Sequence, residues 1–327
     1  MFFETKNLCF SYYKCPLTLK DVNFSFAQNS KTVVLASKEM GKTTFLKVLS
    51  GFEESRFGNI YFNGKELKQI SDEDKNFSLV LSDIVLFERK TIKQNIDFQC
   101  EMNGIEKFSV ADLENKLNEY NINVSCDTKI KKLSLFEKRK IQILRAIIKS
   151  PKILFLDDQF DGLEENEKAE MFLIYENLLN RKDLSIIFAV SDETYKNLKI
   201  SKFNVDNVLY LNLAEIVKFK SFEEFEKSYG SLNLLKFLNY KKTEQVYIEK
   251  DGKDYYLCKD EVKLFKFDST FNKQLNDLNL EFADIEDCEI LCLSGENISD
   301  LDSFVFNKML KENKFYIFSK LTGNRII

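Results

Sequence analysis

The residues of this chain best suited to chemistry are a glycine, a lysine and two hydroxyls in sequence, Gly41-Lys42-Thr43-Thr44. They follow the apolar run Thr32–Leu35 and open a segment with helical patterning. The spacing resembles a phosphate-binding loop, G-x-x-x-x-G-K-[ST], in which Ala36 replaces the first glycine. In such a loop the amides and the lysine hold phosphates, and the hydroxyl holds Mg²⁺. The pattern predicts a nucleotide phosphate site at the N-terminus of a helix.

A second candidate is a pair of acids, Asp157 and Asp158, at the end of the apolar run Ile153–Leu156. A short continuous apolar run is typical of a strand buried on both faces of a parallel sheet. Carboxylates at its end can supply oxygen ligands for Mg²⁺, or they can merely cap a buried strand. The following Gly162-Leu163 favours the nucleotide interpretation.

Strand-like and helix-like segments alternate over the first two thirds of the chain, which predicts an α/β fold with a largely parallel sheet. Helical patterning is expected from about Thr91 to Tyr120 and over Leu133–Lys149. Later segments predict a β-rich region, with a hairpin at Val246–Leu257 that turns at Asp251-Gly252. The other predicted strands are Phe2–Phe10, Val22–Phe26, Lys31–Leu35, Asn59–Asn63, Phe77–Leu81, Ile186–Val190, Asn207–Leu211, Ile290–Leu293 and Lys314–Phe318.

Composition narrows the class of protein. A chain of 327 residues with 44% hydrophobic residues can build two domains with a sizeable core. The net charge of −4, with acids and bases interspersed, predicts no general affinity for nucleic acid. No histidine is present, so no step can use imidazole, and the seven scattered cysteines predict reduced thiols of a cytosolic protein. The apolar runs are too short to span a bilayer, so we expect a soluble chain.

Several further segments line up in order with one family. Phe10-Ser11-Tyr12 resembles the aromatic loop of the ATP-binding cassette (ABC) ATPases, and Leu133-Ser134-Leu135-Phe136-Glu137 falls at the Leu-Ser-Gly-Gly-Gln signature. Arg145-Ala146 follows at the usual interval, and Asp161–Glu164 falls at the D-loop. The resemblance covers about residues 2–220 and implies an ABC-type P-loop NTPase fold with a helical subdomain.

The resemblance also implies roles for individual residues. Asp157 would be the Mg²⁺-associated carboxylate, and Asp158 stands where the family has its catalytic glutamate. Ser82 and Ser191 fall at the family's glutamine and histidine positions, where we expect inert replacements. The implied binding residues for ATP and Mg²⁺ are Tyr12, Gly41, Lys42, Thr43 and Thr44, together with Ser134, which would act in trans on the nucleotide of the other cassette in a dimer. Tyr12 would stack on the adenine, or else it is an ordinary core aromatic.

Departures from the family pattern predict weakened hydrolysis. Glu39 occupies a glycine position, so a carboxylate would lie near phosphates on a backbone that favours glycine. Asp158 is one methylene shorter than glutamate, and a displacement of about 1 Å can cost on the order of a hundredfold in rate. Leu135 and Phe136 replace the two signature glycines, which places bulk where close backbone approach is needed.

The expected organisation is an ATP-binding domain at residues 1–220 with its helical subdomain near 85–150, a connector at 221–244 and a small β-rich domain at 245–327. The spacing is closest to carbohydrate-importer ATPases, which carry a C-terminal oligonucleotide-fold-like (OB/TOBE-like) region and often end near a segment like Phe318–Arg325. This second resemblance carries the importer expectation.

Two functions remain open from the sequence. The first is the cytosolic ATP-binding subunit of an importer for sugars or similar solutes, peripheral at the inner face of the membrane and paired with permease subunits. The second is a non-hydrolysing scaffold or regulatory subunit that pairs with a competent cassette. Either way we expect a homodimer or heterodimer of cassettes, while a soluble two-cassette protein is disfavoured because one set of motifs is present.

Overall fold

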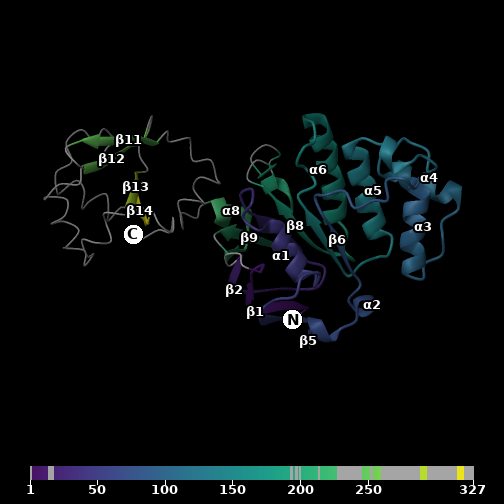
Figure 1. Ribbon diagram of the computed structural model, residues 1–327, viewed down its shortest axis with the longest axis horizontal. Helices are drawn as coiled ribbons and strands as arrows, with labels where there is room; N and C mark the ends of the chain where they lie inside the picture. The colour runs from purple at the N-terminus through teal and green to yellow at the C-terminus, as the bar shows by residue number, and fades with distance from the viewer. Residues whose placement is uncertain are drawn as a thin grey trace. The chain divides into compact units, whose positions relative to one another are not determined.

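The computed structural model describes residues 2–13, 18–191, 194–195, 198, 200–212 and 214–226, and the strands at 245–250, 253–258, 288–292 and 315–319. Two compact units divide the chain, Met1–Glu226 and Lys227–Ile327 (Figure 1). Across the described residues, none of the helices combines the length and apolar character needed to cross a bilayer.

A six-stranded sheet forms the frame of the first unit, in the order β10-β9-β3-β8-β7-β6. Strand β3 pairs in parallel with β8 and β9, β7 pairs in parallel with β8 and β6, and only β10 runs antiparallel, beside β9. Parallel strands align their carboxyl ends at one edge, where ligands bind in open α/β sheets. The strands are β3 (Lys31–Leu35), β6 (Phe77–Val80), β7 (Ile153–Asp157), β8 (Ser185–Val190), β9 (Asn207–Asn212) and β10 (Glu215–Phe219).

A separate antiparallel sheet, β2-β1-β4-β5, packs its apolar face toward helix α1 (Lys42–Leu49). Alternating burial along β1 turns Phe3, Leu8 and Phe10 inward, as a half-buried strand requires. The Phe24 ring of this sheet lies 5.9 Å from the Phe45 ring of α1, so phenylalanine supplies much of this core. The strands are β1 (Phe3–Phe10), β2 (Leu19–Phe26), β4 (Phe57–Phe62) and β5 (Lys65–Glu66).

Helices between β6 and β7 form a lobe beside the parallel sheet (Figure 1). The predicted helical stretch from Thr91 to Tyr120 is two helices, α3 (Ile92–Met102) and α4 (Val110–Glu119), separated near Gly104. Thr91 and Ser109 cap the two helices with their side chains. Further helical elements of this unit are α5 (Leu135–Ile147), α6 (Glu165–Leu179), the short α2 (Asp72–Lys75) and α8 (Phe222–Glu226), and the 3₁₀ turns η1 (Leu67–Gln69), η2 (Ile130–Lys132) and η3 (Ile200–Lys202).

The described part of the second unit is two antiparallel strand pairs. Strands β11 (Gln245–Lys250) and β12 (Lys253–Cys258) form an antiparallel pair in which Lys250 lies opposite Lys253. This pairing agrees with the predicted hairpin. Its predicted Asp-Gly turn, residues 251–252, lies outside the described residues. The other pair is β13 (Cys288–Cys292) and β14 (Phe315–Ser319).

Candidate functional site

The predicted phosphate loop connects strand β3 to helix α1 at the carboxyl edge of the parallel sheet. The Lys42 ammonium donates hydrogen bonds to the carbonyl oxygens of Ala36, at 3.1 Å, and Ser37, at 2.9 Å. These bonds fold the loop around a buried lysine at the first position of α1. A cation and the N-terminus of a helix are thereby directed to one place, as phosphate binding requires.

Gly41 provides the left-handed turn that starts helix α1. Its φ is 87°, and a Cβ at this position would lie 3.0 Å from the Cγ2 of Thr18. Within α1, all of which the structure describes, the first turn carries no acidic side chain and Gly41 supplies no side-chain cap. The first turn of α1 therefore carries no negative charge that would oppose a bound anion.

Glu39 also takes the left-handed conformation, with φ of 64°. This region costs an L-residue about 1–2 kcal/mol, because its Cβ approaches the following carbonyl oxygen. The side chain is exposed on the loop. The backbone strain expected at this glycine position is therefore present in the folded chain.

One carboxylate oxygen of Asp157 accepts hydrogen bonds from two hydroxyl groups. Thr43 Oγ1 donates to Asp157 Oδ2 at 2.7 Å, and Ser82 Oγ donates to the same oxygen at 3.1 Å. The three side chains come from α1, from the end of β7 and from the segment after β6. An oxygen-only cluster of carboxylate and hydroxyls is the donor set that Mg²⁺ prefers.

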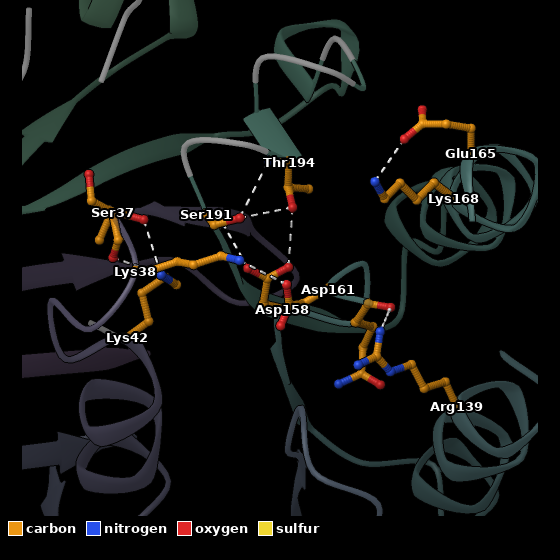
Figure 2. A network of polar contacts seen from close by, with 12 residues as sticks. Ser37, Lys38, Lys42, Arg139, Asp158, Asp161, Glu165, Lys168, Ser191 and Thr194 are labelled. Carbon is orange, nitrogen blue, oxygen red and sulfur yellow. Dashed lines mark hydrogen bonds and ion pairs between the residues drawn. The ribbon is translucent and has the colours of Figure 1, made fainter. Parts of the chain in front are cut away.

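Asp158 points toward Ser191 and Thr194, in the segment after strand β8 (Figure 2). Its Oδ2 accepts from the Ser191 backbone N–H at 2.9 Å, and its Oδ1 accepts from the Thr194 hydroxyl at 3.4 Å. Burial raises the pKa of the Asp158 carboxyl, although the nearby Lys42 ammonium and the hydrogen bonds from Ser191 oppose that rise. Both carboxylate oxygens are thus held by protein groups.

An ion pair joins the phosphate loop to the D-loop region. Lys38 Nζ lies 3.2 Å from Asp161 Oδ1, and both side chains are exposed (Figure 2). Exposed pairs of this kind stabilise a fold by about 0–1 kcal/mol. The pair therefore links the two loops only weakly.

The predicted signature segment begins helix α5, and it is capped within the chain. Ser134 Oγ accepts from the Glu137 N–H at 3.1 Å, and the Glu137 carboxylate accepts from the Ser134 N–H at 2.8 Å. This capping box satisfies helix amides and sets a negative charge beside the helix N-terminus. A phosphate approaching this end would meet that charge.

The two residues that replace the signature glycines lie differently. Phe136 is buried, with the Lys140 ammonium 4.4 Å from its ring centre. Leu135 is 39% exposed, and its methyl group lies 3.6 Å from where a Cβ on Gly162 would be. Leu135 alone therefore presents bulk at this surface, whereas the sequence suggested that both residues would.

Two further predicted residues lie at the edges of the site. Tyr12 is 38% exposed after β1 and packs edge-to-face against Phe10 with ring centres 4.9 Å apart. Thr44 sits beside Thr43 in the first turn of α1 and is half-buried.

Three polar residues at the site were missed by sequence reasoning. Thr194 holds Asp158, as described, while Gln142 and Gln159 are buried amides that donate to the carbonyl of Leu81. None of the three belongs to a motif. The signal that could have singled out Gln142 is a lone amide on the apolar face of a predicted helix.

The residues present fit MgATP. Helix α1 offers uncapped amides behind a glycine whose Cβ position is closed, Lys42 supplies a cation, and Thr43 with Asp157 supplies the oxygen ligands for a metal ion. These groups converge at the carboxyl edge of the sheet. The arrangement can bind a nucleoside triphosphate with its metal.

Comparisons with known proteins agree with this geometry. A family model described as ABC transporter matches residues 19–161. The spermidine/putrescine import ATP-binding protein PotA of Clostridium novyi (strain NT) is 26% identical over 191 residues, which cover 58% of this chain and 55% of that protein. The chain thus spans about half the length of this curated relative.

Two solved structures share the fold. A dimer of the ATP-binding cassette MJ0796, in a post-hydrolysis state with ADP and Pi, matches with a TM-score of 0.56 at 15% identity, covering 67% of this chain and 98% of that chain. The ATP-binding subunit of an ABC transporter matches with a TM-score of 0.55 at 22% identity, covering 67% of this chain and 90% of that chain. The chain therefore shares the α/β fold of these ATP-binding cassette structures, and its residues 19–161 match the ABC transporter family model.

Proposed function

We propose that this chain is the ATP-binding subunit of an ABC transporter, and that it binds MgATP but hydrolyses it slowly. The single observation that carries the proposal is the 2.7 Å contact between Thr43 and Asp157, beside the buried ammonium of Lys42. In this proposal Lys42 holds the phosphates, Thr43 and Asp157 hold Mg²⁺, and Tyr12 stacks the base. MgATP, when bound, supplies the phosphoryl group and the binding energy that closes a cassette dimer.

Slow hydrolysis follows from the position of Asp158. A general base must lie within hydrogen-bond reach of the water it activates. Here the two carboxylate oxygens are engaged by Ser191 and Thr194, so neither is directed at an attacking water. The Ser82 hydroxyl is engaged by Asp157 and the Ser191 hydroxyl by Thr194, which supports the view that neither replaces a catalytic glutamine or histidine.

We place the subunit in a small-solute importer, on the inner face of the membrane with a second cassette and permease subunits. The relative named for spermidine and putrescine import supports this class, while the C-terminal resemblance favours sugars, so the proposal extends to small solutes in general. The domain limits proposed from the sequence, with an OB/TOBE-like region at 245–327, complete this assignment.

A second candidate is a scaffold subunit that never hydrolyses ATP itself. The Glu137 carboxylate at the N-terminus of α5 favours it, because that charge opposes a partner's nucleotide at the end carrying Ser134. In such a heterodimer the chain would stabilise the assembly, and turnover would rely on the partner's residues.

Calorimetric titration with MgATP tests the leading proposal. Wild-type chain is expected to bind in the micromolar to millimolar range, and Lys42→Ala is expected to abolish binding, while Lys47→Ala on the same helix serves as the matched control. Both variants should still unfold in one cooperative transition above the temperature of the titration, which separates lost binding from lost folding. Absence of binding by the wild type at millimolar ATP would overturn the proposal and leave the scaffold.

A further inference from the structure

The segment after strand β6, residues 81–85, is held by side chains from two other elements; we name it the 81–85 loop. Gln142 of helix α5 donates to the carbonyls of Leu81, at 2.8 Å, and Asp83, at 3.1 Å, and accepts from the Val85 N–H at 2.9 Å. Arg145, one turn further along α5, donates to the Val85 carbonyl at 3.0 Å. Irregular backbone is thereby given the partners that a sheet would have supplied.

Gln159 fastens the same loop from the other side. Its Nε2 donates to the Leu81 carbonyl at 2.8 Å and to the Asp157 carbonyl at 2.6 Å. Its Oε1 is buried and has no hydrogen-bond partner among the described residues, which is a cost to the fold. The contribution of Gln159 therefore comes from its Nε2, which joins the backbone at Leu81 to the backbone at Asp157.

The loop carries Ser82, whose hydroxyl reaches Asp157 Oδ2 at 3.1 Å. Asp157 is therefore bound to the loop twice, through its side chain by Ser82 and through its backbone by Gln159. Gln142 and Gln159 both donate to the Leu81 carbonyl, so helix α5 is connected to Asp157 through only a few hydrogen bonds. A movement of α5 would therefore displace Asp157.

We propose that Gln142 and Gln159 are positioning residues that fasten the 81–85 loop to helix α5 and to the end of strand β7, and so set the geometry of the Asp157 metal ligand. The inference rests on the proposed function for its metal, but the fastening itself is a property of the chain alone. It gives α5, the helix that begins at Ser134, a direct link to the metal ligand.

Amide hydrogen exchange on the chain without nucleotide tests the fastening. Gln142→Met keeps the size of the side chain and removes its hydrogen bonds, so exchange of the Val85 amide should accelerate by about tenfold or more. Asn95→Leu is the matched control, because Asn95 is a fully buried amide that donates to the carbonyls of Phe87 and Thr91 and accepts from the Phe87 N–H. It should accelerate the Phe87 amide and leave Val85 unchanged.

Titration of ATP with and without Mg²⁺ tests the positioning. Gln142→Met and Gln159→Met should each reduce the gain in ATP affinity that Mg²⁺ provides by several-fold, and leave affinity in EDTA close to wild type. Unchanged Val85 exchange, equal losses with and without Mg²⁺, or the same loss in Asn95→Leu would each overturn the inference. A wild-type chain that fails to bind MgATP would overturn the proposed function, and Val85 exchange would still decide the fastening.

Discussion

The hydroxyl of Thr43 lies 2.7 Å from a carboxylate oxygen of Asp157, although the two residues are 114 positions apart. Thr43→Val keeps the branched shape of the side chain and removes this hydroxyl. We expect at least a tenfold loss of ATP affinity in the presence of Mg²⁺, since groups that ligate or orient a metal typically contribute about 10–100-fold. Isothermal calorimetry with Mg²⁺ and with EDTA measures this loss. Ser50→Ala, which removes a hydroxyl at the opposite end of α1, is the control, and equal losses in both variants would contradict the assignment.

Charge and backbone strain at Glu39 can be separated by two substitutions. Glu39→Gln removes the carboxylate near the predicted phosphates, so MgATP affinity should rise by about fivefold, as expected for charges a few ångströms apart near a surface. Glu39→Gly should raise affinity equally and also relieve strain of about 1–2 kcal/mol, offset by about 0.5–1 kcal/mol of glycine chain entropy.

Urea unfolding with MgATP titration measures both effects of the Glu39 variants. Ala214→Gly is the matched control, because Ala214 has a φ of 72° on a turn between β9 and β10. It should change stability in the same direction and leave nucleotide affinity alone. If only Glu39→Gly raised affinity, backbone shape rather than charge would govern the loop.

The raised pKa of Asp158 makes stability depend on pH. The folded chain holds this proton more tightly than the unfolded chain, so the contribution is full below the unfolded pKa of about 3.9 and is lost as pH rises through the folded pKa. Asp158→Asn keeps an acceptor for Ser191 without the charge. It should therefore be more stable than wild type at pH 7, and the difference should shrink as the pH falls toward 4.

Asp183→Asn is the control of opposite sign for this pH dependence. Its hydrogen bond from Arg181 lowers the pKa of Asp183, so that carboxylate stabilises the fold above its unfolded pKa and ceases to do so as pH falls. Asp183→Asn should be slightly less stable than wild type at pH 7. Urea titrations between pH 4 and 7 follow both variants, and a gap for Asp158→Asn that widened toward acid would refute the burial argument.

The capping box of helix α5 predicts unequal effects at Glu137. Glu137→Ala removes the bond to the Ser134 N–H and should cost about 0.5–1.5 kcal/mol of unfolding free energy. Glu137→Gln keeps that bond and should lose only the charge–dipole contribution, about 0.3–1 kcal/mol. Gln94→Ala, in the corresponding box that Thr91 opens on α3, calibrates the loss without touching the signature segment. Equal losses of unfolding free energy in the two Glu137 variants would contradict a stabilising role for the Ser134–Glu137 capping box.

Much of the frame could be predicted from the sequence, because buried parallel strands are continuous apolar runs. Lys31–Leu35 is found as predicted, and β7 and β8 differ from their predictions by one residue. The separate antiparallel sheet was not foreseen, since period-two patterning marks strands such as β1 without naming their partners. The break near Gly104 was visible only as a glycine followed by a Ser109 cap.

The residues of the site could be predicted where their chemical type identifies them, but the contacts that orient them could not. Lys42, Thr43 and Asp157 were singled out, and the structure brings Thr43 and Asp157 into contact. The turning of Asp158 toward Thr194 depends on the path of the chain after β8, which no local pattern encodes. Nor does a local pattern show that Gln142 bonds to Leu81, because that contact joins residues 61 positions apart.

Helix α5 completes its own N-terminus, since Ser134 and Glu137 satisfy each other's amides within one chain. The cohesion of this helix consequently does not depend on protein concentration, unlike a surface that is finished only by a second molecule. The N-terminus of α5 should therefore already be formed in chain that is purified alone, before any partner is added.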